Sequence, residues 1–307
     1  MPTPPAMLRD GLLTRALAAT FVALATGCAV APGEATNETR DELRTKGAIL
    51  ALGDSVVYGW DPFRSPGQLV VDPAKYEGFP ERLGERLRLP VHNAALPGET
   101  SSSVLDARAP YDADRFDPAA FGIHHEWKVG GRRFDAQMAF VEAYLAENEP
   151  KLIVLSIGGN DLISLQTKRC KDDPFCIAGG LLGTIHAYGD NLTEIFARIA
   201  RAGYEGKIAL VTQYSPDYGK VVNDVALGGM AMKTRAFIAD ERQRHPQFDV
   251  LLVDGYAAFG RAAAGGDTCR TGLLLRNPDG SSCDIHPSPK GDALLADLVV
   301  DALERRD

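Results

Sequence analysis

Short apolar runs alternate with segments of helical periodicity along most of the chain. The runs are rich in Val, Ile, Leu and Ala and predict five buried strands, at residues 48–52, 91–96, 152–157, 208–212 and 250–253. Apolar side chains at helical spacing predict amphipathic helices within residues 79–87, 134–145, 185–199 and 294–299. Alternating strands and helices favour a parallel sheet covered on both faces, because the crossovers are right-handed. The pattern therefore predicts a three-layer α/β/α sandwich with a central five-stranded parallel sheet.

Three long stretches, residues 106–133, 164–183 and 261–282, fit neither a strand nor a core helix. Insertions of such length in a domain are usually lids, binding loops or small local folds. We expect the two large central insertions to shape a substrate pocket.

Residues 1–27 have the order of an export signal, with two arginines, an apolar run at residues 16–25 and small residues before Cys28. The apolar run is too short to span a bilayer. The segment resembles a bacterial lipobox, in which cleavage leaves a lipid-modified cysteine, here Cys28, although Ala25 stands where leucine is common. Ordinary secretion, with cleavage near residues 29–31, is the alternative. Either reading predicts an extracytoplasmic protein, in the periplasm, at the cell surface or secreted.

Residues 28–46 have no apolar periodicity and predict a tether, which leaves residues 47–307 as the folded domain. The formal net charge of the chain is −8, and it becomes −9 without residues 1–27, which hold two arginines and one aspartate. This acidic balance argues against a nucleic-acid partner.

Four cysteines remain after Cys28, an even number that suits an oxidising compartment. They allow three pairings. We expect the two pairs that are local in sequence, Cys170 with Cys176 and Cys269 with Cys283, each pinning one long loop. Four reduced thiols are the alternative.

Four short polar segments follow candidate strands or precede the last helix. They are Gly53-Asp54-Ser55, Leu96-Pro97-Gly98-Glu99-Thr100, Gly158-Gly159-Asn160-Asp161 and Asp284-Ile285-His286-Pro287. Each alone is an ordinary turn. Their order over residues 48–304 resembles that of the SGNH (GDSL) hydrolase family, which implies a flavodoxin-like α/β/α fold and hydrolysis of carboxylic esters.

The resemblance implies that Ser55 is the nucleophile and His286 the general base, with an oxyanion hole made by Ser55, Gly98 and Asn160. The residue types suit these roles. A serine at a strand-to-helix turn exposes its hydroxyl and its backbone N–H. Glycine allows close approach of a backbone N–H, the Asn amide is a neutral donor, and imidazole exchanges protons near neutral pH.

The third triad member departs from the family pattern. Cys283 stands three residues before His286, where the family has an aspartate, and Asp284 stands two before. We predict that Asp284 orients the imidazole, and a backbone carbonyl near Cys283 is the alternative. Asp54 and Asp161 are interpreted as structural hydrogen-bond partners.

Other chemistry finds little support in the sequence. His124, His125 and Glu126 are adjacent and do not match metal-ligand spacing, which favours a solvated loop, and no metal is expected. No glycine-rich phosphate loop follows a strand, so no nucleotide or other cofactor is expected. The segment from Tyr214 to Tyr218 could line an acyl or sugar pocket or form a rigid surface turn.

The sequence thus predicts an exported, monomeric serine ester hydrolase that forms an acyl-enzyme on Ser55 and acts on a small-molecule, lipid or glycan ester. Membrane contact is expected only through an anchor at Cys28. A carbohydrate acetylesterase is the alternative chemistry. A catalytically silent surface-binding protein of the same fold is the alternative of another class.

Overall fold

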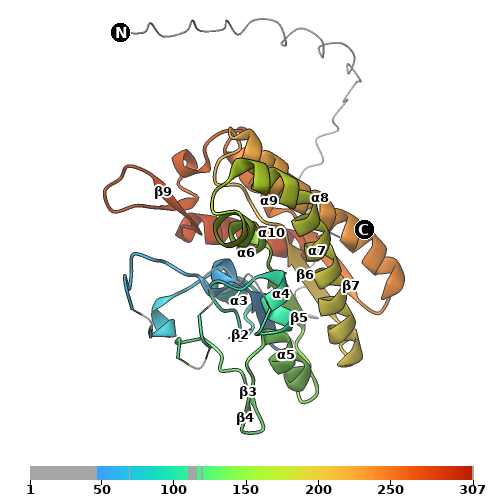
Figure 1. Ribbon diagram of the computed structural model, residues 1–307. Helices are drawn as coiled ribbons and strands as arrows, with labels where there is room; N and C mark the ends of the chain where they lie inside the picture. Colours follow the sequence, from blue (N-terminus) through green and yellow to red (C-terminus); the bar gives the residue numbers. More distant parts are fainter. Residues whose placement is uncertain (1–46, 69, 110–115, 119, 306–307) are drawn as a thin grey trace, which may run out of the picture. The chain divides into compact units, whose positions relative to one another are not determined.

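The fold is built on a five-stranded parallel sheet in the order β2-β1-β5-β6-β7, seen in the computed structural model of the chain (Figure 1). The structure describes residues 47–305 except 69, 110–115 and 119. The strands of the sheet are β1 (Ile49–Gly53), β2 (Val91–Asn93), β5 (Leu152–Ser156), β6 (Lys207–Val211) and β7 (Asp249–Val253). The predicted leader, residues 1–27, and tether, residues 28–46, lie outside the described residues.

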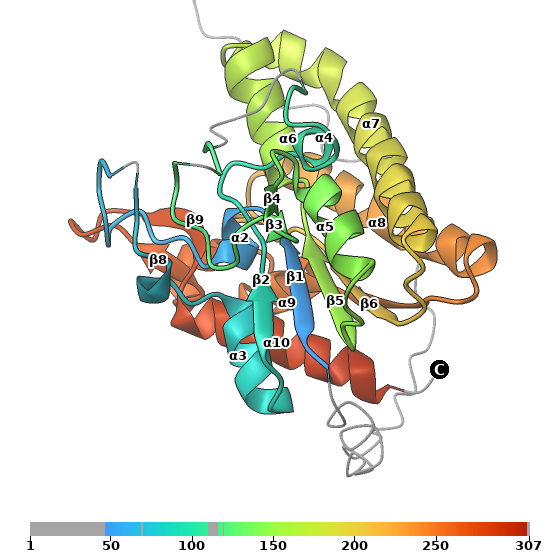
Figure 2. The same ribbon diagram turned by 90° about the horizontal axis from the view of Figure 1, so that it is seen from below.

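Helices cover both faces of this sheet (Figure 2). One face carries α3 (Phe79–Leu87) and α10 (Pro289–Glu304), which pack against each other. The other face carries α4 (Ser101–Leu105), α5 (Gln137–Leu145), α7 (Pro174–Arg201) and α8 (Val221–Arg244). The strands between these layers are almost wholly buried, as expected for a parallel sheet covered on both sides. The predicted three-layer α/β/α sandwich is confirmed.

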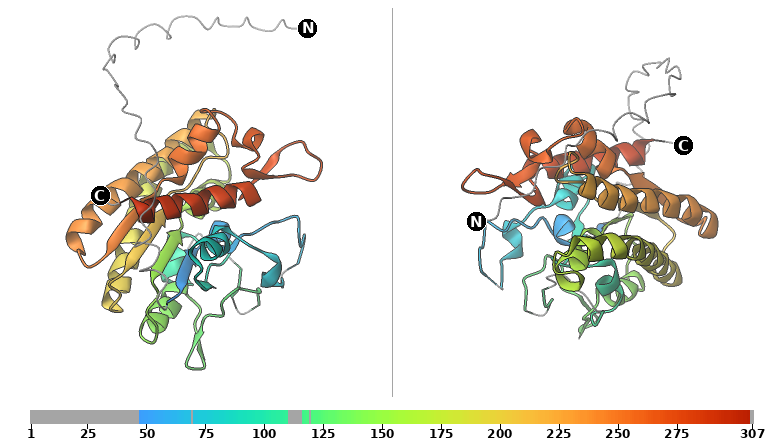
Figure 3. Two further views of the ribbon diagram at one scale, coloured as in Figure 1. Left: turned by 180° about the vertical axis from the view of Figure 1, so that it is seen from behind. Right: turned by 45° about the horizontal axis from the view of Figure 1, so that its top comes forward.

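Shorter elements cluster around the carboxyl ends of the strands or form small hairpins. They are α2 (Ser55–Tyr58), η1 (Pro73–Lys75), α6 (Gly159–Ser164), the π-helical turn η2 (Leu165–Arg169), α9 (Gly255–Ala262), η3 (Thr268–Thr271), and the hairpins β3 (Lys128–Val129) with β4 (Arg132–Arg133) and β8 (Leu274–Arg276) with β9 (Cys283–Pro287). The β8–β9 hairpin precedes α10 directly and stands out at the start of that helix (Figure 3).

The structure corrects the sequence prediction in three places. The strand predicted at residues 91–96 ends at Asn93, although the N–H groups of Ala94 and Leu96 still donate to the carbonyls of Ala51 and Gly53 in β1. Much of the insertion at residues 164–183 is helical, because η2 and the first turns of α7 occupy it. The long helix α8 has no counterpart among the predicted helices.

Two disulfides join Cys170 to Cys176 and Cys269 to Cys283, which is the expected local pairing. The first closes the loop between η2 and α7, and the second ties η3 to the start of β9. Disulfides of this kind are typical of proteins that fold outside the cytoplasm. Among residues 47–305, as far as the structure describes them, no helix is long and apolar enough to cross a membrane.

Candidate active site

Ser55 is the first residue of α2, and only Asp54 separates it from the end of β1. The turn requires a glycine at position 53, where φ is +142° and a Cβ would lie 2.0 Å from the carbonyl oxygen of Ser156. The buried amide of Gln137 accepts a hydrogen bond from the N–H of Gly53 at 2.8 Å and donates to its carbonyl at 3.0 Å. These contacts hold rigid the turn that presents Ser55.

His286 lies against Ser55, with 2.8 Å between its Nε2 and the serine Oγ. The two residues are 231 positions apart in the chain, and each is 9% exposed. Strand β9 carries His286. The hydroxyl of Tyr214, which follows β6, donates to the carbonyl of Ile285 at 2.7 Å and fastens β9 over the end of the sheet.

Asp284 holds the other side of the imidazole. Its Oδ1 accepts hydrogen bonds from the backbone N–H of His286, at 3.0 Å, and from Nδ1 of the same residue. Burial acts to raise the pKa of Asp284, but the hydrogen bonds and charge of His286 outweigh it and keep the pKa below the ordinary value of 3.8. An ionised carboxylate only accepts hydrogen bonds, so Nδ1 carries a proton, and in the neutral form of the imidazole the lone pair of Nε2 faces Ser55.

Asp284 and His286 are only two positions apart, and a tight local turn joins them. In this turn Oδ1 of Asp284 accepts from the backbone N–H and from Nδ1 of His286. Cys283, at the family position of the acid, is bonded to Cys269. The carboxylate of Asp284, and not a backbone carbonyl near Cys283, lies at Nδ1 of His286.

Asn160 lies in the first turn of α6, directly beyond the end of β5. Its Nδ2 donates to the carbonyl of Glu99 at 2.9 Å, which fixes the amide and leaves its second hydrogen for another acceptor. Asn160 and Ser55 line the same cavity. Gly98, with φ of +83°, precedes Glu99 in the turn that Asn160 contacts, but Gly98 is not among the cavity residues.

Asp54 and Asp161 brace these turns. The carboxylate of Asp54 caps α2 by accepting from the N–H of Val56 at 3.0 Å, and its burial raises its pKa to about 7. Asp161 accepts from the N–H and the hydroxyl of Ser101, at 2.9 and 2.5 Å. Both aspartates therefore make the structural contacts that we expected of them.

The Ser55–His286 pair opens into a cavity of about 240 Å³ with a mainly apolar lining. Most of the apolar side chains come from α6, η2, α7, α8 and β9, and Val56 of α2 and Pro216 add to them. Those from the five elements are Leu162, Ile163, Leu165, Ile177, Leu181, Val222, Ala226, Leu227 and Ile285. Asn160, Gln213 and Tyr214 supply polar groups near the serine. Pockets that hold small organic ligands have this composition, an apolar wall with a few placed polar groups.

Of the two central insertions, as far as the structure describes them, one shapes this cavity. Residues 164–183 contribute through η2 and α7, whereas none of the described residues of 106–133 lines it. The π-helical turn η2 was not predicted, and turns of this kind occur often at functional sites. Tyr214 and Pro216 line the cavity, but Asp217 and Tyr218 do not.

The histidine pair at positions 124 and 125 is half-buried and does not form a solvated loop, which corrects the prediction. His124 lies 3.0 Å from the carbonyl of Tyr58, and the ring of His125 packs against Phe140. Burial lowers the pKa of both imidazoles. Among the described residues there is no group of three or more His, Cys, Asp or Glu that could hold a metal ion.

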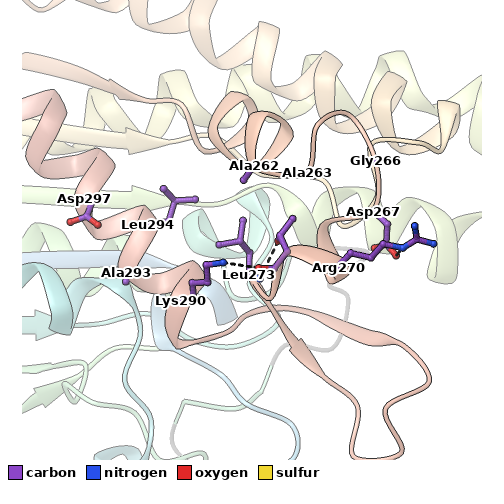
Figure 4. A pocket seen from close by; sticks show the side chains of 11 residues that line it. Ala262, Ala263, Gly266, Asp267, Arg270, Leu273, Lys290, Ala293, Leu294 and Asp297 are labelled. Atoms are coloured by element: carbon purple, nitrogen blue, oxygen red, sulfur yellow. Dashed lines mark hydrogen bonds and ion pairs between the residues drawn. The ribbon is translucent and has the colours of Figure 1, made fainter. Parts of the chain in front are cut away.

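A larger hollow of about 750 Å³ lies between η3 and α10 (Figure 4). Lys290 crosses it and donates to the carbonyl of Thr271 at 2.8 Å. Its lining residues include neither Ser55 nor His286, so it is separate from the candidate site.

The parallel α/β/α sheet, together with a serine, a histidine and an aspartate in hydrogen-bond sequence at its carboxyl edge, defines an SGNH-type hydrolase fold. The chain matches the model of the GDSL-like lipase/acylhydrolase family over residues 51–294, and it belongs to that family. No curated protein sequence is significantly similar to the chain.

Solved structures share the fold at low sequence identity. A catalytic mutant of an acetylxylan esterase from Geobacillus stearothermophilus is 17% identical with a TM-score of 0.52, over 85% of this chain and 97% of that one. A protein from Parabacteroides merdae described as a GDSL-like lipase is 15% identical with a TM-score of 0.51, over 84% of this chain and 95% of that one. At these identities the likeness concerns the fold alone.

Proposed function

We propose that this hydrolase is an exported serine esterase that cleaves carboxylic esters with an apolar acyl chain longer than acetyl. The observation that carries the proposal is the hydrogen-bonded series Ser55–His286–Asp284 at the mouth of an apolar cavity. The cavity volume of about 240 Å³ equals that of about eight water molecules in the liquid, which is room for several methylene groups.

The geometry supports a two-step mechanism. Ser55 Oγ attacks the ester carbonyl carbon while Nε2 of His286 takes the hydroxyl proton, and Asp284 stabilises the imidazolium that forms. The imidazolium then gives its proton to the departing alkoxide as the carbon–oxygen bond breaks. In the second step His286 removes a proton from water, and the hydroxide formed attacks the acyl carbon. The bond from that carbon to Ser55 Oγ then breaks, the imidazolium returns its proton to Oγ, and the acid leaves.

Negative charge develops on the carbonyl oxygen in both steps, and hydrogen-bond donors must stabilise it. We assign these to the N–H of Ser55, the N–H of Gly98 and the amide of Asn160. Ser55 begins α2, and the first N–H groups of a helix have no partner within the helix. The hydrogen bond from Asn160 to the carbonyl of Glu99 fixes the amide beforehand, so no reorganisation is needed in the transition state.

Replacing Asn160 by alanine is expected to lower kcat about 10²- to 10³-fold while KM changes little, because the donor acts mainly on the developing oxyanion. The measurement is steady-state hydrolysis of p-nitrophenyl butyrate. Asn223→Ala is the matched control, since Asn223 lines the same cavity from α8 and donates instead to the carbonyl of Asp217. An equal loss of kcat in the two variants would show that Asn160 is not an oxyanion donor.

A panel of p-nitrophenyl esters from acetate to palmitate tests the proposed substrate class. We expect the highest kcat/KM for an acyl chain of intermediate length, because each buried methylene adds to transition-state binding until the cavity is full. A preference for acetate, with turnover of an acetylated glycan, would favour a carbohydrate acetylesterase. If the protein hydrolyses none of these esters, the proposed function is wrong.

Filling the cavity should shift this preference. Leu181→Trp is expected to lower kcat/KM for p-nitrophenyl octanoate about tenfold or more and to spare the acetate, because the larger ring occupies the acyl space. Met232→Trp is the matched control on α8, where the side chain is 65% exposed and does not line the cavity. If both variants lose octanoate activity equally, the acyl chain lies elsewhere.

A further inference from the structure

Large apolar side chains are exposed around the mouth of the active-site cavity. Of the eight exposed large hydrophobic residues in the described part of the chain, six belong to the first turns of α7 and α8 or to β9. We call these six the apolar rim: Phe175, Leu182, Val221, Val222, Val225 and Ile285. The most exposed are Phe175, at 87%, and Val221, at 76%, so water covers side chains that are usually buried.

The rim is continuous with the cavity. Val222 and Ile285 line the cavity and are also exposed, which places them at its mouth. The first turns of α7 and α8 contribute to both, since Ile177 and Ala226 point into the cavity. An acyl chain that enters the cavity from an apolar phase would therefore cross a mainly apolar surface, with Gln166 and Asn223 among the lining residues.

Fixed local structure presents these side chains. Phe175 stands at the start of α7, where Asp173 caps the helix by accepting from its N–H at 2.9 Å, and the Cys170–Cys176 disulfide closes the loop beside it. The helices α7 and α8 pack against each other (Figure 1). This contact joins the rim residues of α7 to those of α8. Helices held in this way present apolar side chains to a partner without having to fold first.

Cations lie beside the rim although the chain as a whole is acidic. Lys168, Arg169 and Lys171 precede α7, together with Asp172 and Asp173 in the same loop. Lys220 precedes α8, where it pairs with Asp217 at 3.6 Å and where Asp224 lies in the first turn. Apolar side chains bordered by Lys and Arg are typical of protein surfaces that rest on a lipid headgroup layer. A second copy of the chain seated on the rim would cover the cavity mouth that a substrate must use.

We propose that the apolar rim docks the enzyme on the surface of a phospholipid bilayer, so that ester lipids pass from the bilayer into the cavity. This inference rests on the proposed function, because the lipid is then hydrolysed at Ser55. The docking itself needs no catalysis. It adds a membrane contact to the anchor predicted at Cys28, which was the only one expected from the sequence.

The test measures co-sedimentation of the full chain with sucrose-loaded phosphatidylcholine vesicles. Cys28→Ser removes the anchor, and Ser55→Ala keeps the vesicles intact. In this background, Phe175→Ser with Val221→Ser is expected to weaken vesicle binding about tenfold or more, since both changes remove apolar surface from the contact. The control pair, Val70→Ser with Met232→Ser, changes side chains that are 67% and 65% exposed and lie outside the cavity lining. It should bind as the background protein does.

Three results would overturn the docking surface. These are no vesicle binding by the background protein, equal losses in the rim and control pairs, or binding only to phosphatidylglycerol vesicles that disappears in salt. A dimer in sedimentation velocity that the rim pair abolishes would also overturn it, by assigning the rim to a second copy.

A separate readout keeps the two proposals apart. With Ser55 present, the rim pair should hydrolyse dissolved p-nitrophenyl butyrate at the wild-type rate, because neither residue lines the cavity. Absence of hydrolysis in the wild type would count against the proposed function while leaving the vesicle result standing. A rim pair that loses butyrate hydrolysis as well would contradict a role confined to docking.

Discussion

Ser55→Ala is expected to lower kcat/KM for every ester substrate about 10⁴-fold or more. The methyl group cannot attack a carbonyl, and the lone pair of His286 Nε2 then faces no nucleophile of the protein. The stability should change little, because Ser55 is only one position in a turn that Gln137 and Asp54 hold through other atoms. The measurement is kcat/KM on p-nitrophenyl butyrate, together with the thermal unfolding midpoint.

Ser164→Ala is the matched control for this prediction. Ser164 is a buried serine at the end of α6, and its hydroxyl makes no hydrogen bond. Removing that hydroxyl should leave hydrolysis unchanged. If Ser55→Ala keeps activity comparable to that of Ser164→Ala, the nucleophile is another group and the fold could serve a binding function without catalysis.

Asp284→Asn is expected to lower kcat about 10³- to 10⁴-fold. The amide can donate to Nδ1, which would place the imidazole proton on Nε2 and leave no base facing Ser55. The pKa of Asp284 lies below 3.8, so the carboxylate is ionised throughout the range from about pH 5 to 8. The loss should therefore be present at both ends of this range, since the carboxylate is not protonated within it.

Asp279→Asn provides the comparison within the same hairpin. Asp279 is exposed between β8 and β9 and accepts only from the N–H and hydroxyl of Ser281. Its replacement should leave kcat unchanged. A loss of less than about tenfold in Asp284→Asn would show that a backbone carbonyl suffices to orient His286.

The sheet was predictable from the sequence because its strands are apolar on both faces. Residues 48–52 and 152–157 have no polar alternation, and such runs occur in parallel sheets under two helical layers. The helices were less predictable. The first turns of α8 expose Val221, Val222 and Val225, so its apolar side chains do not gather on one buried face and give no helical stripe.

The polar segments of the site were also predictable, since parallel strands end at one edge of a sheet and bring their following turns together. Gly53 of β1 pairs with Ser156 of β5 in the ladder, which places Ser55 and Asn160 on neighbouring turns. The hydrogen bonds that hold these turns in place were not predictable. Gln137 lies 84 residues from Gly53, and Tyr214 lies 71 residues from Ile285, so only the tertiary fold reveals these contacts.

The position of Asp284 relative to His286 shows that a sequence motif does not specify every contact of the site. A spacing rule looks for a carboxylate three residues before the histidine, but position 283 holds a disulfide cysteine. Asp284 reaches Nδ1 from two residues away, because the same oxygen also accepts from the backbone N–H of His286 and closes a tight turn. Rotamer and turn geometry decide this contact, and the order of residue types does not specify them.

The most direct test of the proposed mechanism is covalent labelling with a fluorophosphonate, followed by intact-mass and peptide-mapping mass spectrometry. Serine attacks the phosphorus, fluoride leaves, and the adduct stays on the nucleophile. We predict one adduct per chain, located on Ser55, formed slowly when His286 is replaced by alanine and not at all in Ser55→Ala. An unlabelled wild-type protein, or an adduct that persists in Ser55→Ala, would contradict catalysis by this serine.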